Sequence, residues 1–71
     1  MLTKLEADIL QMTWDGEDSQ GIARKMGIHA TNIDAAKVRL YYKWGVKNAV
    51  QLVKEGLARR LLKVPKRKED V

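Results

Sequence analysis

Gly27 does more than any other residue to limit how this chain can fold. Before it, apolar side chains recur at helical spacing: Ile22, Ala23 and Met26. After it they do so again over a longer stretch: Ile33, Leu40 and Trp44. Glycine has no Cβ, so it readily takes the left-handed conformation that ends a helix. The sequence therefore predicts a short helix, a tight turn through Gly27 and Ile28, and a longer helix set at an angle to the first.

Two helices joined by a short glycine-containing turn are typical of the helix-turn-helix motif, whose second helix lies in the major groove of DNA. We predict this second helix over about residues 31–44. Its face opposite the apolar series lacks the Glu and Lys of a plain solvated surface. That face carries Thr31, Ala35, Val38 and Tyr42. Small apolar groups suit contacts with thymine methyls, so the pattern favours DNA as the ligand.

Charge is divided unevenly along the chain. Residues 1–22 carry one lysine against five acidic residues, whereas residues 23–68 carry thirteen Lys or Arg against two acidic residues. A basic half attached to an acidic first helix is expected of a protein that faces polyphosphate on one side. A solvated basic surface on a small domain would have the same charge, so this distribution supports nucleic-acid binding but does not prove it.

Good N-cap residues precede three helical stretches: Thr3, Asp18 or Ser19, and Asn48. Thr3 and Glu6 have the spacing of a capping box, so a first helix is expected to begin here and run to about Trp14. The last helix is expected over about residues 49–62. The chain is therefore predicted to be all-α, with four helices.

These helices place a helix-turn-helix domain over residues 1–62. A basic segment follows over residues 63–71, where Pro65 stops any helix. We expect this tail to be disordered in the free protein.

Composition argues against several classes of function. The 71 residues include no cysteine and one histidine, His29, so we predict no metal site and no cofactor. No apolar run approaches the length of a membrane span, and the N-terminus lacks the residue order of a secretory signal. No nucleophile stands with a base, which argues against an enzyme. We expect a cytoplasmic, nucleoid-associated protein without membrane contact.

The predicted fourth helix has two faces with apolar character. One face is a continuous apolar stripe: Val50, Val53, Leu57 and Leu61. The other is partly apolar: Ala49, Leu52 and Gly56. One face can close the domain, and the other lacks a partner in so short a chain, so self-association is expected. We assign the dimer interface to Ala49, Leu52, Val53 and Gly56.

The order of landmarks resembles the LuxR/GerE-type helix-turn-helix family over residues 2–62, with no gap. The matching landmarks are Leu2-Thr3, Gly16, Ile22-Ala23, Met26-Gly27-Ile28, Asn32-Ile33, Lys43-Trp44-Gly45-Val46 and Leu61-Leu62. The chain departs from the family pattern where Gly21 replaces an acidic residue, His29 replaces a serine cap and Arg60 replaces a late glycine. The resemblance implies dimerisation through the fourth helix and a stand-alone, GerE-like domain.

The resemblance also places base contacts on three positions: Asp34, Ala35 and Val38. We expect DNA backbone contacts from cations and from residues near helix N-termini: Ser19, Gln20, Thr31, Asn32, Lys37, Arg39, Lys43 and Lys47. Asp34 can accept a hydrogen bond from a cytosine amine or stabilise the helix dipole. The polar residues near helix N-termini can bind phosphate or cap the helices, and the sequence leaves these alternatives open.

These observations predict a bacterial or phage transcription regulator that binds double-stranded DNA sequence-specifically as a homodimer. RNA polymerase or a regulatory protein is a further expected partner. The alternatives are a phage promoter-recognition, packaging or recombination adaptor, and a protein-interaction module that docks a partner on Ala35, Val38 and Tyr42. Salt separates the two kinds of binding, because phosphate contacts weaken steeply with salt and apolar docking does not.

Overall fold

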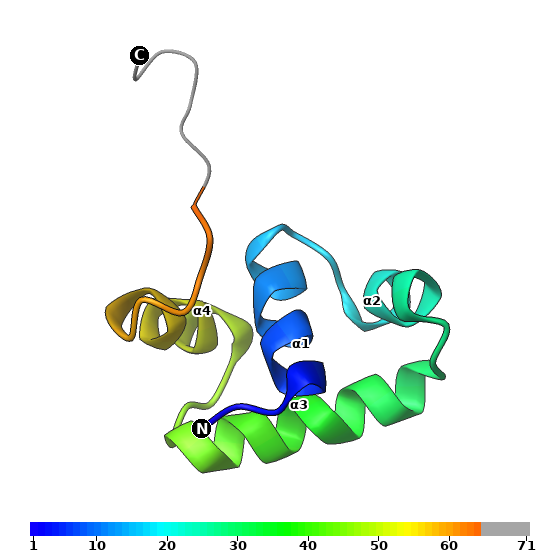
Figure 1. Ribbon diagram of the computed structural model, residues 1–71. Coiled ribbons are helices and arrows are strands. Elements are labelled where there is room, and N and C mark those ends of the chain that lie inside the picture. Colours follow the sequence, from blue (N-terminus) through cyan, green and yellow to red (C-terminus); the bar gives the residue numbers. More distant parts are fainter. Residues whose placement is uncertain (65–71) are drawn as a thin grey trace, which may run out of the picture.

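The computed structural model describes residues 1–64, and residues 65–71 of the predicted tail lie outside the described part. The described residues form four helices and no strand: α1 (Lys4–Trp14), α2 (Ser19–Met26), α3 (Ala30–Trp44) and α4 (Ala49–Ala58). In Figure 1, α3 lies along the bottom, α1 stands above its middle, and α2 and α4 flank α1 on opposite sides. The all-α, four-helix prediction is confirmed.

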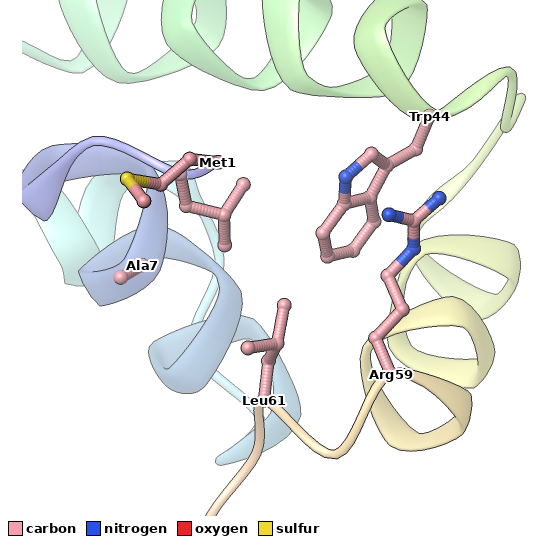
Figure 2. Close-up of a pocket in the computed structure, with 6 residues that line it drawn as sticks. Met1, Ala7, Trp44, Arg59 and Leu61 are labelled. Carbon is pink, nitrogen blue, oxygen red and sulfur yellow. The ribbon is translucent and has the colours of Figure 1, made fainter.

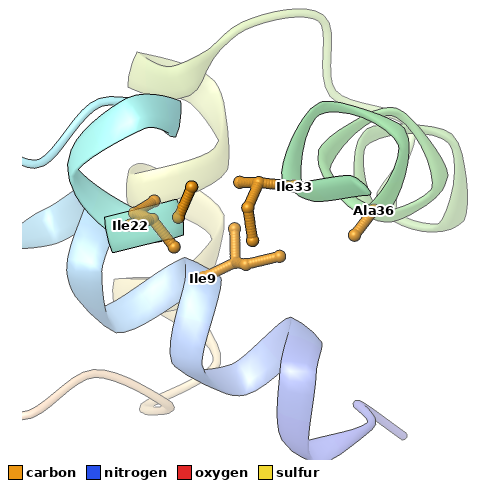
Figure 3. Close-up of a cluster of buried hydrophobic side chains, with 5 residues drawn as sticks. Ile9, Ile22, Ile33 and Ala36 are labelled. Carbon is orange, nitrogen blue, oxygen red and sulfur yellow. The ribbon is translucent and has the colours of Figure 1, made fainter. Parts of the chain in front are cut away.

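The core consists of two apolar clusters that meet at α1. The first lies between α1, α2 and α3 (Figure 3), and its buried members are Ile9, Ile22, Ala23, Ile33 and Ala36. The second joins α1, α3 and α4 through Leu10, Leu40 and Leu52. Ile9 and Leu10 are neighbours in sequence, and the turn of the helix between them directs one side chain into each cluster. Helix α1 therefore holds the helix-turn-helix pair and α4 together.

Three of the four helices begin with the predicted side-chain caps. The Glu6 amide donates to Thr3 Oγ1 at 3.1 Å and the Thr3 amide donates to Glu6 Oε1 at 2.9 Å, which completes the capping box. Asp18 accepts from the Gly21 amide at 2.8 Å, and Asn48 accepts from the Gln51 amide at 2.9 Å. Helix α3 differs, because the residue before it, His29, makes no side-chain cap bond.

All four helices end in the same way. A residue with positive φ follows each helix: Gly16, Gly27, Gly45 and Arg60. After α4, the Leu61 amide donates to the Gly56 carbonyl and the Arg60 amide to the Leu57 carbonyl, each at 3.0 Å. These paired bonds form a Schellman motif. Arg60, with φ of 58°, takes the conformation that a glycine adopts without steric cost.

The predicted end of α4 is wrong, because the helix stops at Ala58 and not at Leu62. The left-handed residue Arg60 turns the chain back, and Leu62 then packs on the cluster of Leu10, Leu40 and Leu52. Gln11 of α1 holds the chain beyond this point: its amide accepts from the Lys63 N–H at 2.9 Å and donates to the Lys63 carbonyl at 3.1 Å.

Burial in the single chain also counts against part of the predicted dimer face of α4. Leu52 is fully buried in the monomer, and a Cβ at Gly56 would lie 3.0 Å from Leu10 Cδ1. These two residues therefore close the domain, and their burial counts against the predicted contact with a second copy. The outer face of α4 is the other stripe, on which Val50 is 64% exposed and Leu57 is 40% exposed. In the described residues, no helix is long and apolar enough to cross a membrane.

Candidate nucleic-acid interface

The outer face of α3 carries the side chains that the sequence placed there. Val38 is 62% exposed and Tyr42 is 89% exposed, and Asp34 and Ala35 are exposed beside them. The inner face of the same helix is buried: Ile33, Ala36 and Leu40. We use "α3 outer face" for Asp34, Ala35, Val38 and Tyr42. This face joins small apolar groups, an aromatic ring and one carboxylate in a single stripe.

Cations flank the α3 outer face on both sides. Arg39 is exposed next to Val38, and Lys37 on its other side is half-buried, so that its stem lies along the domain while its ammonium can reach solvent. Lys47 is exposed in the turn that follows α3. The arrangement provides positive charge on both sides of a stripe that itself has no cation, as a helix needs if it approaches base edges between two rows of phosphates.

Lys43 is held within the domain by an ion pair that the sequence analysis did not find. Its ammonium lies 2.7 Å from the buried carboxylate of Glu6 and 3.3 Å from the Met1 carbonyl oxygen. The hydrogen bond from Lys43, followed by the bond from the Thr3 amide, lowers the pKa of the Glu6 carboxyl below its ordinary value of 4.5. The predicted phosphate contact of Lys43 would have to compete with this pair.

The N-terminus of α2 is filled by the chain's own carboxylates. Asp18 caps the helix, and Glu17 pairs with Lys25. Gly21 leaves room for this arrangement, because a Cβ there would lie 2.8 Å from Glu17 Oε1. A phosphate group that approached α2 at this end would meet two negative charges. The predicted backbone contacts of Ser19 and Gln20, which lie beside these carboxylates, are therefore electrostatically unfavourable.

The N-terminus of α3 offers the opposite environment. Thr31 and Asn32 are exposed in its first turn, and His29 supplies no cap bond. The Asn32 amide already donates to the His29 carbonyl at 3.0 Å, but no side chain caps the amides before it, and these amides and the positive end of the helix dipole suit an anion. Of the two helix N-termini that the sequence proposed as phosphate sites, the structure favours the one on α3.

Two hollows lie away from the α3 outer face. The first, of about 330 Å³ (Figure 2), is lined by Met1, Leu2, Ala7, Trp44, Arg59 and Leu61. Within it the Arg59 guanidinium stacks 4.6 Å from the Trp44 ring centroid and pairs with Glu55 at 3.0 Å. The second, of about 450 Å³, follows the outer face of α4: Thr13, Trp14, Ala49, Val50, Val53, Lys54 and Leu57. Residues 1–64 contain no group of three side chains arranged to hold a metal ion.

A helix pair turned through Gly27, with an exposed second helix packed on a short first helix, defines a helix-turn-helix domain. The model of one protein family, described as bacterial regulatory proteins, luxR family, matches residues 1–55. This match covers more than three quarters of the chain, which therefore belongs to the luxR family of bacterial regulatory proteins. A comparison with curated proteins finds no match.

Family membership confirms the resemblance found in the sequence and indicates a DNA-binding regulatory domain. The matched region includes all of α1, α2 and α3 and ends at Glu55 within α4. The assignments of individual residues to bases, to phosphates or to a second copy remain predictions.

Proposed function

We propose that this chain is a sequence-specific transcription regulator that places α3 in the major groove of double-stranded DNA. The observation that carries the proposal is the α3 outer face, where exposed Ala35 and Val38 lie between flanking cations in a chain of the luxR family. Asp34, Ala35 and Val38 are the proposed base contacts. The proposed backbone contacts are Thr31, Asn32, Lys37, Arg39 and Lys47.

The protein is proposed to act as a homodimer through the outer face of α4. This surface is apolar, half-exposed and continuous with the hollow beside Trp14: Ala49, Val50, Val53 and Leu57. Apolar side chains gathered on one exposed helix face favour a protein contact over open solvent. We further propose a cytoplasmic protein associated with the nucleoid and without enzymatic activity. In this proposal residues 1–62 form the domain and residues 63–71 form a basic tail.

The test is the selection of DNA sites from a random duplex library with the purified protein at near-physiological salt. We expect an enriched inverted repeat whose half-sites lie about one helical turn apart, because each copy of α3 must enter the same face of the duplex. Asp34→Ala and Val38→Ala should change the enriched sequence, whereas Arg39→Ala should weaken binding to every duplex. Unchanged affinity and preference in all three variants would exclude α3 as the groove helix.

One alternative has an observation of its own. The α3 outer face bears no Lys or Arg within its stripe, and its exposed apolar members could dock a protein partner. Titrations over a range of salt concentrations separate the two cases, since DNA affinity falls steeply with salt and apolar docking does not. Salt-dependent DNA binding without an enriched sequence would instead favour an architectural, packaging or recombination adaptor.

A further inference from the structure

Two neighbouring tyrosines near the end of α3 have opposite environments. Tyr41 packs against the cluster of Leu10, Leu40 and Leu52, and its burial, with a smaller effect of the Asp34 carboxylate, raises the pKa of its hydroxyl. Tyr42 is almost fully exposed and belongs to neither apolar cluster. The fold therefore needs Tyr41 but does not need Tyr42. A large aromatic side chain left in solvent on a proposed binding face is a candidate for contact with the ligand.

The register of α3 places Tyr42 in line with the proposed base contacts. It follows Val38 by four residues and Ala35 by seven, so all three lie on one stripe. At 1.5 Å per residue, the Cα atoms of Ala35 and Tyr42 are separated by about 10 Å along the helix axis. The major groove is about 12 Å wide, and the N-terminal residues of a recognition helix are the ones that contact base edges. With Ala35 over the bases, Tyr42 reaches the sugar–phosphate wall of the groove.

Lys43, the next residue along the chain, is poorly placed to contact a phosphate on that side of the groove. Lys43 is the cation nearest to this end of α3, but its ammonium is held by the buried Glu6 carboxylate and the Met1 carbonyl. Moving Lys43 to a phosphate would leave Glu6 buried without its partner, which carries a large free-energy cost. At this end of α3 the hydroxyl of Tyr42 is therefore free to meet a phosphate, whereas the ammonium of Lys43 is not; the next exposed cation is Lys47, in the turn that follows the helix.

We propose that Tyr42 is a DNA-positioning residue, whose hydroxyl donates a hydrogen bond to a backbone phosphate while its ring covers the adjacent sugar. This inference rests on the proposed function. Tyrosine is among the side chains that contact phosphates and thereby fix the register of a protein on the duplex. Since the side chain is neutral, the contact adds affinity without releasing a counterion.

The test compares the wild-type protein with Tyr42→Phe and Tyr42→Ala on the selected duplex and on a scrambled duplex, over a range of salt concentrations. Tyr42→Phe removes only the hydroxyl and should weaken binding to both duplexes by about three- to tenfold, the usual worth of one hydrogen bond. Tyr42→Ala should weaken binding further. Neither variant should change the slope of affinity against salt, whereas Arg39→Ala should lower that slope by about one.

Two controls tie the effect to one phosphate. Tyr41→Phe, at the neighbouring half-buried position, should leave DNA affinity within about twofold of wild type. Duplexes with single methylphosphonates should reveal one position where loss of the phosphate charge weakens wild type but has little further effect on Tyr42→Phe. Thermal unfolding of both Tyr42 variants should match wild type, because Tyr42 is exposed.

The outcomes separate this inference from the proposed function. If the wild-type protein binds DNA with salt-dependent affinity and both Tyr42 variants bind as tightly, the positioning role is wrong and the proposed function stands. If Tyr42→Ala changes the preferred sequence, Tyr42 contacts a base and the phosphate assignment is overturned. If the wild-type protein binds no duplex, the proposed function fails and this inference fails with it.

Discussion

Helices α3 and α4 each bury one face against α1 and leave the other exposed, but their outer faces differ in charge. The α3 outer face has cations on both flanks and a carboxylate in its stripe. The outer face of α4 is an apolar strip beside Trp14 with one lysine, Lys54, on its edge. Both faces expose valine, so exposure of apolar groups does not distinguish them.

The charges around the apolar groups suggest the partner of each face. Apolar groups between cations can approach the bases of a polyanion, because the cations meet the phosphates on each side. Apolar groups without such flanks gain most from covering one another, as in the contact between two copies of a protein. This comparison supports the proposals that α3 binds DNA and that α4 binds a second copy. Four substitutions test the structural contrast between the two helices.

The largest expected effect is on the inner face of α4. Leu52→Ala should destabilise the domain by about 2–5 kcal/mol, because Leu52 is fully buried between α1 and α3 and its removal leaves a cavity. Urea denaturation measures this change. Val53→Ala, one position along the same helix and only half-buried, is the matched control and should cost less. Equal losses in both variants would mean that the two faces of α4 are not distinct.

On the outer face of α4, Val50→Asp should weaken self-association by about tenfold or more, since it places a charge in an apolar contact. Sedimentation over a range of concentrations measures the effect. The variant should keep the wild-type unfolding midpoint as a monomer because Val50 is exposed. It should also keep its affinity for a single half-site. A dimer that survives this change would move the interface elsewhere.

The end of α4 offers a smaller test, with opposite sign. Arg60→Gly should stabilise the domain by about 1 kcal/mol, because glycine removes the steric cost of the left-handed backbone at φ of 58°. Arg60→Ala keeps the Cβ and removes the charge, so it should bring no comparable gain. Urea midpoints of the two variants distinguish backbone strain from charge repulsion, since a gain in both would indicate charge.

The packing of α3 on α1 should contribute stability that depends on pH, whereas the packing of α4 on α1 should not. The pKa of Glu6 lies below 4.5 in the folded protein, so its pairing with Lys43 stabilises the fold above that pH and is lost as the pH falls further. Glu6→Gln keeps a capping-box side chain but lacks the charge. It should melt below wild type at neutral pH, with a gap that narrows as the pH falls below the ordinary pKa of the carboxyl, because wild-type Glu6 then loses its charge too. A constant gap would contradict this role.

Local rules were sufficient to predict how the helices begin. Thr3, Asp18 and Asn48 each cap the helix that follows, because a cap depends on residues only three positions apart. The inner face of α3 was also predictable. Large apolar side chains, Ile33 and Leu40, recur on it at helical spacing, whereas the outer face includes Asp34 and the hydroxyl of Tyr42.

The errors concern features that depend on contacts distant in sequence. Both faces of α4 are apolar, so periodicity predicts a helix without showing which face meets α1; the close approach of Leu10 to Gly56 decides it. The early end of α4 follows from the place that Leu62 finds in the same cluster. The pair of Glu6 and Lys43 spans 37 positions, and neither residue has a local signal that names its partner.

The shared way of ending helices also affects how mutational scans of this domain should be interpreted. Gly27 follows the end of α2 and Gly45 follows the end of α3, and no atom outside their own chain neighbours lies within 4 Å of the place that a Cβ would occupy. An alanine at either position would touch nothing and still strain the backbone at positive φ. A scan scored on DNA binding alone would mark both glycines as contact residues, although the damage would lie in the amount of folded protein. Normalising each variant to its folded fraction would remove these false positives.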